Sequence, residues 1–195
     1  MKEYLKSKKV TSGIINLGGN VLTIGSKSDG SDYTVGIQKP FDRSGTSIAT
    51  IKIDDRSVVT SGIYERYYRV DGKIYHHILD TQTGYPVEND LYSVTIISDS
   101  SCDGDALSTT CFALGKDKAE EFIKSMDGVE AIFVDNKMNV PQVIGLQQAD
   151  DPVRVTNGGN LWSGNYKGLV STCNGVFEPL LDLSLIHISE PTRRS

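Results

Sequence analysis

Between residues 11 and 70 the chain is a succession of short β-forming runs separated by turns rich in glycine and aspartate. The runs expected to form strands are 13–17, 21–25, 33–37, 47–53, 57–62 and 64–70. Gly18-Gly19-Asn20 separates the first two runs, and Asp71-Gly72 follows the last. Glycine pairs and Asp-Gly between β-type runs are typical of hairpins, so this part of the chain predicts antiparallel strand pairs.

After residue 90 the pattern changes. Residues 91–97 are β-formers, and Ser100 with Asp103 three positions later is typical of a helix start. Apolar and small residues then recur at helical spacing at Ala106, Leu107, Thr110, Cys111 and Leu114. Gly115 is expected to end this helix, and a second helix (116–126) and a strand (129–134) follow. This order favours an α+β fold in which helices pack on a mixed or antiparallel sheet.

The composition is that of a globular protein of 195 residues, long enough for one domain with a buried core. The chain has 20 basic and 25 acidic residues, a net charge of -5 and no block of Lys and Arg. These features exclude the electrostatic footprint of a nucleic-acid partner. No apolar run approaches the ~20 residues that span a bilayer. The three cysteines are an odd number, which argues against a complete disulfide framework.

The predicted elements occupy residues 1–140, with residues 1–9 expected to be the last turns of a helix. Residues 141–182 are rich in Gly, Asn, Gln and Asp and have little periodicity, so no element is predicted there. Residues 183–195 resemble the translated end of a transposon adapter used in DNA sequencing libraries. We therefore expect this tail to lie outside the fold and give His187 no role.

Two segments carry residues suited to chemistry. The first is the loop 76–86, HHILDTQTGYP, which presents His76, His77 and Asp80. Residue types alone leave three roles open: a transition-metal site, a general base oriented by a carboxylate, and a polar turn. Metal binding is the weakest of these, because adjacent side chains rarely converge and the only other histidine is His187. An imidazole titrates near neutrality, which favours the acid–base role.

The second segment is 103–110, DGDALSTT. Asp105 and Thr109 are four residues apart, so on a helix they lie on one face. A carboxylate and a hydroxyl near a helix N-terminus suit a hard cation with oxygen ligands, and that helix end also favours a phosphate. The alternative is purely structural, because Asp103 and Asp105 also suit a helix start.

A resemblance adds to these readings. The consecutive segments SGIINLGGN, TSGIYERYY, DGKIYHHILDTQTGYP and LYSVTIISDSSCDGDALSTTCFALG resemble the signatures of the ApbE family of FAD:protein FMN transferases, in order and spacing, over residues 12–134. Glycine pairs alone are common. The combination of HHILDxxTGxP with the later DALSTxxFxLG is specific.

The resemblance implies an Mg²⁺-dependent transfer of FMN from FAD to a threonine of an acceptor flavoprotein subunit, with AMP released. It implies that Asp105 and Thr109 ligate Mg²⁺ and that His77 is the general base. Asp80 would orient the imidazole or lie near the metal. The residues implied to line the flavin cleft are Gly18, Gly19, Asn20, His77 and the turn Thr60, Ser61 and Gly62.

The chain also departs from the family pattern. Thr81 stands where the family usually has proline. Family members carry a further N-terminal part that supplies much of the flavin pocket and a backbone carbonyl ligand to the metal. We expect Met1 to lie just after it and the chain by itself to be inactive. The resemblance alone implies a place on the extracytoplasmic side of the cytoplasmic membrane, anchored through that segment.

Three alternatives to transfer remain open at this point. One is a flavin- or metal-binding module, the second is an FAD pyrophosphate hydrolase without transfer activity, and the third is a non-functional product of a truncated reading frame.

Overall fold

The computed structural model describes residues 1–138, 142–144, 153–155 and 186–187. Its central layer is a six-stranded sheet in which every neighbouring pair is antiparallel. In spatial order its strands are β1 (Gly13–Asn16), β2 (Asn20–Ile24), β5 (Ser57–Gly62), β8 (Leu91–Ser98), β9 (Glu130–Asp135) and β10 (Gln142–Ile144). Strands that are distant in the sequence thus become neighbours, because β5 lies between β2 and β8.

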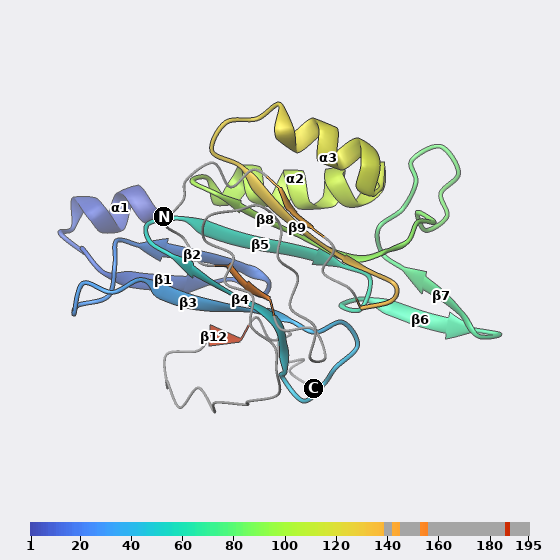
Figure 1. The fold of residues 1–195 in the computed structure, drawn as a ribbon, viewed down its shortest axis with the longest axis horizontal. Coiled ribbons are helices and arrows are strands. Elements are labelled where there is room, and N and C mark those ends of the chain that lie inside the picture. The colour runs from blue at the N-terminus through green and yellow to red at the C-terminus, as the bar shows by residue number, and fades with distance from the viewer. Residues whose placement is uncertain (139–141, 145–152, 156–185, 188–195) are drawn as a thin grey trace.

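A second sheet lies against one face of the first (Figure 1). Its spatial order is β11 (Val153–Val155), β4 (Ser47–Ile53), β3 (Tyr33–Gln38) and β12 (Ile186–His187). The two residues of β12 belong to the tail that was expected outside the fold, and they pair in parallel with Val35 and Gly36 of β3. The remaining tail residues and most of 141–182 lie outside the described residues.

The other face of the six-stranded sheet is covered by two helices, α2 (Ser101–Leu114) and α3 (Lys116–Lys124) (Figure 1). A short helix, α1 (Lys2–Ser7), begins the chain, and the hairpin of β6 (Tyr67–Val70) and β7 (Lys73–His76) projects from the sheets (Figure 1). This arrangement confirms the predicted α+β class. No helix among the described residues is long and apolar enough to cross a membrane.

Both faces of the central sheet are therefore buried in apolar cores. One core lies between the two sheets and includes Val58, Ile97 and Ile132. The other lies under the helices and includes Ile96, Phe112 and Phe133. Because the strands alternate their side chains between the two faces, neighbouring residues of β5 and β8 reach different cores. This alternation decides which residues of β5 can meet α2.

The helix α2 begins as the sequence predicts, since the Asp103 backbone N–H donates to Ser100 Oγ at 3.2 Å. It ends at Gly115, whose φ is 75°. The predicted buried face was partly wrong: Ala106 and Thr110 are exposed, and Leu114 is 41% exposed. The residues that are buried are Gly104, Leu107, Ser108, Cys111 and Phe112. Small residues replace part of the apolar stripe because the helix lies very close to β5.

The close packing of α2 predicts the effect of Gly104→Ala. A Cβ at Gly104 would lie 2.8 Å from Val59 Cγ2 and 3.2 Å from Ser98 Oγ. Helix propensity alone would stabilise the alanine variant by about 1 kcal/mol. Overpacking costs roughly 1–3 kcal/mol, so we expect net destabilisation. Urea unfolding of both proteins gives the sign directly, and a more stable alanine variant would show that the contact with β5 is loose.

Candidate active site

The glycine pair forms the turn between β1 and β2. Gly18 and Gly19 have φ values of 65° and 89°, a region that favours glycine. The Gly18 backbone N–H donates to Asn16 Oδ1 at 3.1 Å, and the Thr60 N–H donates to the Gly19 carbonyl at 3.0 Å. The turn is therefore fixed beside β5. Residues 60–62, which the resemblance implies to be a turn of the flavin cleft, are the last part of strand β5, as the β-type run 57–62 predicts.

Asn20 joins this turn to the start of α2. Ser101 Oγ donates to Asn20 Oδ1 at 2.6 Å, and Asn20 Nδ2 donates to the Ser101 carbonyl at 3.4 Å. The glycine turn, the end of β5 and the first turn of α2 are thus held side by side. These are three of the segments that the resemblance assigns to the flavin cleft and the metal.

The three residues at the end of β5 differ in what they present to α2. Ser61 faces the helix, with its Oγ 2.8 Å from Ser108 Oγ and 3.0 Å from Thr109 Oγ1. The Thr60 hydroxyl is buried on the opposite face, 2.8 Å from Thr95 Oγ1. Gly62 has no side chain, and this leaves room for the ring of Tyr64. A Cβ at Gly62 would lie only 2.6 Å from Tyr64 Cε1. Ser61 alone of the three brings a polar side chain to α2.

Asp105 and Thr109 are both exposed on α2, one turn apart on the same side. The Thr109 hydroxyl lies 3.4 Å from the Asp105 carbonyl oxygen. A carboxylate and a hydroxyl fit Mg²⁺, which takes oxygen ligands and keeps several waters. Among the described residues no three His, Cys, Asp or Glu side chains gather to hold a metal. A cation at these two residues would therefore complete its shell with water or phosphate oxygens.

The structure separates the two adjacent histidines. His76 is buried, with its Nε2 3.2 Å from the Val87 carbonyl oxygen, while the Ile78 N–H donates to its Nδ1 at 3.3 Å. Its ring meets Phe112 of α2 edge to face, with centroids 5.7 Å apart. Burial lowers the pKa of His76, so the ring is neutral at neutral pH. His76 is therefore a structural residue that fixes this loop against α2.

His77 is exposed and points away from that core. Its backbone N–H donates to the Arg66 carbonyl at 3.2 Å, and its Nδ1 lies 3.3 Å from the same oxygen. Since a carbonyl oxygen only accepts, this contact requires the proton on Nδ1, and in the neutral ring the lone pair of Nε2 is then left to accept another. His77 is thus in the tautomer that a general base requires.

Asp80 lies in the turn that follows. Its carboxylate accepts from the Gln82 N–H at 2.8 Å, its own N–H donates to the Tyr85 carbonyl at 2.8 Å, and Gly84 N–H donates to its carbonyl at 2.8 Å. In this structure the Asp80 side chain shapes the loop, and the Arg66 carbonyl, which the sequence did not reveal, holds the His77 ring. A catalytic part for Asp80 stays a prediction.

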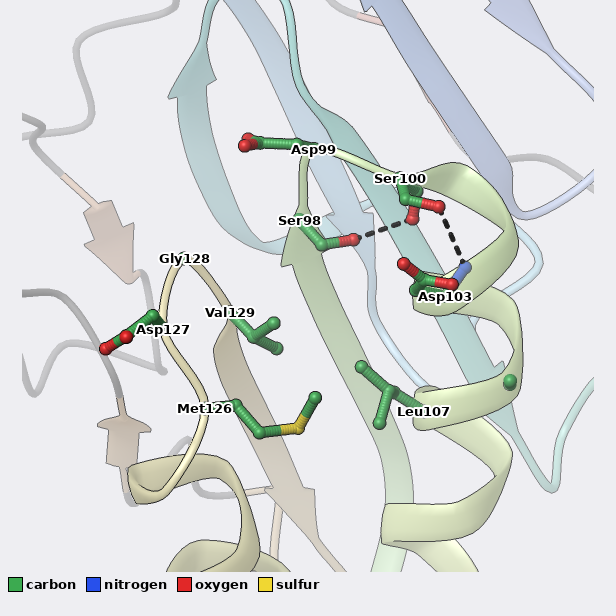
Figure 2. A pocket seen from close by; sticks show the side chains of 10 residues that line it. Ser98, Asp99, Ser100, Asp103, Leu107, Met126, Asp127, Gly128 and Val129 are labelled. Carbon is green, nitrogen blue, oxygen red and sulfur yellow. Dashed lines mark hydrogen bonds between the residues drawn. The ribbon is translucent and has the colours of Figure 1, made fainter.

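A pocket of about 400 Å³ opens between the start of α2 and the segment that follows α3 (Figure 2). The side chains of Leu107, Met126 and Val129 point into it, and the carboxylates of Asp99 and Asp127 lie at its rim (Figure 2). None of the site residues expected from the sequence lines this pocket.

Known proteins resemble this chain in sequence. The model of the ApbE family matches residues 1–133. The chain is 43% identical over 159 residues to the FAD:protein FMN transferase of Klebsiella pneumoniae (strain 342), which covers 80% of this chain and 48% of the relative. It is 36% identical over 140 residues to that of Treponema pallidum (strain Nichols), covering 68% of this chain and 39% of the relative.

Solved structures show the same likeness. The ApbE protein of Thermotoga maritima aligns with a TM-score of 0.65 and 35% identity over 72% of this chain and 46% of that one. The flavinyl transferase ApbE of Pseudomonas stutzeri aligns with a TM-score of 0.57 and 32% identity over 73% and 42%. The chain spans about half the length or less of the curated relatives it matches. Because the family model covers well over half of its residues, the chain belongs to the ApbE family.

Proposed function

We propose that this chain forms part of a flavin transferase that moves FMN from FAD to a threonine of an acceptor protein and releases AMP. The observation that carries the proposal is the placement of His77. Its loop is fixed by His76 against Phe112, one turn beyond Thr109 on the helix that also bears Asp105. The helix α2 therefore carries the two oxygen ligands for a cation, and the loop packed against α2 carries the base. The names of the relatives support this assignment.

The threonine Oγ forms a bond to the phosphorus of the FMN half of FAD, and the bond from that phosphorus to the bridging oxygen breaks, so that AMP leaves. The proton of the threonine hydroxyl passes to His77 Nε2. Asp105 and Thr109 would hold Mg²⁺, which when bound offsets the negative charge that the pyrophosphate gathers. Gly18 and Gly19 leave room for the nucleotide to approach the backbone.

A second candidate is hydrolysis of the FAD pyrophosphate. The exposure of His77 favours it, because water can then reach the same base. The two functions differ in their product: transfer leaves FMN covalently on the acceptor, and hydrolysis leaves it free. Placement of the protein on the outer side of the cytoplasmic membrane stays a prediction from the family.

The metal assignment predicts that Asp105→Ala weakens Mg²⁺ binding by at least about tenfold, the loss typical even of outer partners of a metal ligand. Mg²⁺ would be titrated into the parent chain and the variant by calorimetry. Asp117→Ala is the matched control, since Asp117 is an exposed acidic residue in the first turn of α3 and its loss changes the net charge equally. Equal responses of the two variants would remove Asp105 from the site.

A further inference from the structure

Three hydroxyl groups meet where β5 packs on α2. Ser61 is half-buried on the strand, Ser108 is buried on the helix, and Thr109 is exposed beside it. Ser61 Oγ lies 2.8 Å from Ser108 Oγ and 3.0 Å from Thr109 Oγ1. The carbonyl oxygen of Asp105 lies 3.0 Å from Ser108 Oγ and 3.4 Å from Thr109 Oγ1. Four contacts thus compete for three hydroxyl protons.

One direction of donation satisfies all three hydroxyls. Thr109 donates to Ser61, Ser61 donates to Ser108, and Ser108 donates to the Asp105 carbonyl. The contact left without a proton is the longest of the four, from Thr109 to the Asp105 carbonyl. The reverse direction also lets each hydroxyl donate once, but it uses the 3.4 Å contact from Thr109 to the Asp105 carbonyl and leaves the 3.0 Å contact from Ser108 without a proton, so the distances favour the first direction.

This chain of hydrogen bonds matters for Thr109. A helical threonine commonly turns its hydroxyl to the carbonyl four residues earlier, and here that is the carbonyl of Asp105. The contact with Ser61 is shorter, so it draws the proton toward the strand. The lone pairs of Thr109 Oγ1 are then left for the exposed side of the helix, where the Asp105 side chain also lies.

We propose that Ser61 is a positioning residue that takes the proton of Thr109 and so presents the Thr109 oxygen to a divalent cation. The proposal rests on the cation site at Asp105 and Thr109 put forward above, and it gives Ser61 a part other than contact with the flavin. Ser61 is itself no ligand: it acts through Thr109. Partners of this kind fix the orientation of a metal ligand and tune its affinity.

The test measures Mn²⁺ binding to the full 195-residue chain from the electron paramagnetic resonance signal of free Mn²⁺, which prefers the same oxygen ligands as Mg²⁺. Ser61→Ala is expected to weaken binding about tenfold, the low end of the loss for such an outer partner and within the range of one neutral hydrogen bond. Ser61→Thr keeps the hydroxyl and should bind within about twofold of the parent. Ser61→Cys keeps the size with a weak acceptor and should lose as much as alanine.

A double-substitution cycle with Thr109→Val separates this role from general support of the fold. In the Thr109→Val background, Ser61→Ala should cause no further loss of affinity. An equal loss in both backgrounds, or parent-like affinity of Ser61→Ala and Ser61→Cys, would overturn the proposal. Asp105→Ala distinguishes failure of the Ser61 role from failure of the cation site itself. If Asp105→Ala alone weakens binding, the cation site stands and only Ser61 is wrong. If Asp105→Ala binds as the parent does, the cation site fails, and the role of Ser61 fails with it.

Discussion

Replacing His77 by alanine is expected to lower the rate of flavin transfer by roughly 10²–10⁴-fold while FAD binding changes little. The reason is the His77 Nε2, which in the neutral ring is the unprotonated nitrogen because the Arg66 carbonyl accepts from Nδ1. Because the chain spans about half of its relatives, the assay uses a chimera in which it replaces the matching segment of the Klebsiella pneumoniae relative. Covalent flavin on a threonine-containing acceptor is followed by in-gel fluorescence.

His76→Gln is the natural control, because it changes the adjacent histidine. His76 is buried against Phe112, and its Nε2 lies 3.2 Å from the Val87 carbonyl oxygen. We therefore expect its loss to lower the melting temperature and to change the flavin-transfer rate of the folded protein only slightly. His77→Ala should show the opposite pattern. Full labelling of the acceptor by the His77→Ala chimera would remove His77 from the mechanism.

The second large effect concerns stability and centres on Arg56. Its Nη1 lies 2.8 and 2.7 Å from the two carboxylate oxygens of Glu130, and its Nη2 donates to the Gly128 carbonyl at 2.8 Å. The two side chains are only 21% and 11% exposed. They join the start of β5 to the start of β9, across β8. Removing Glu130 leaves the largely buried Arg56 with only the exposed carboxylate of Asp99, 3.3 Å from its Nε.

We therefore expect Glu130→Ala to lower the free energy of unfolding by about 3 kcal/mol, at the low end for buried pairs because some solvent reaches the site. Urea unfolding measures it. Glu88→Ala, which breaks the exposed pair with Lys73, should change little. The double change Arg56→Met with Glu130→Leu should recover part of the loss, since two apolar side chains leave no unpaired charge. Equal effects of Glu130→Ala and Glu88→Ala would show that the pair contributes nothing.

Much of the fold follows from local sequence. The glycine pair and Asp71-Gly72 form the hairpin turns that their types predict, and Ser100 caps α2. Local pattern does not reveal which distant strands pair. The position of β5 between β2 and β8 could therefore not be predicted from the sequence. The run 64–70 contains a strand only from Tyr67 onward, because the preceding Tyr64 is buried beside Phe41 instead.

The candidate site, like the fold, could be predicted from the sequence only in part. Helical spacing was enough to place Asp105 and Thr109 on one face. Spacing did not reveal that Ser61 reaches Thr109, because that contact depends on the close approach of Gly104 to Val59. Nor does a loop sequence distinguish His76 from His77. Burial of the first against Phe112 and exposure of the second separate them, and both depend on tertiary packing.

The proposed transfer is tested most directly by measuring two products of one reaction. The chimera is incubated with FAD, Mg²⁺ and the acceptor, and covalent flavin on the acceptor and released AMP are quantified together. Transfer predicts equal amounts of the two, with both lost in Asp105→Ala and His77→Ala. AMP accompanied by free FMN and an unlabelled acceptor would contradict transfer and identify the protein as a hydrolase.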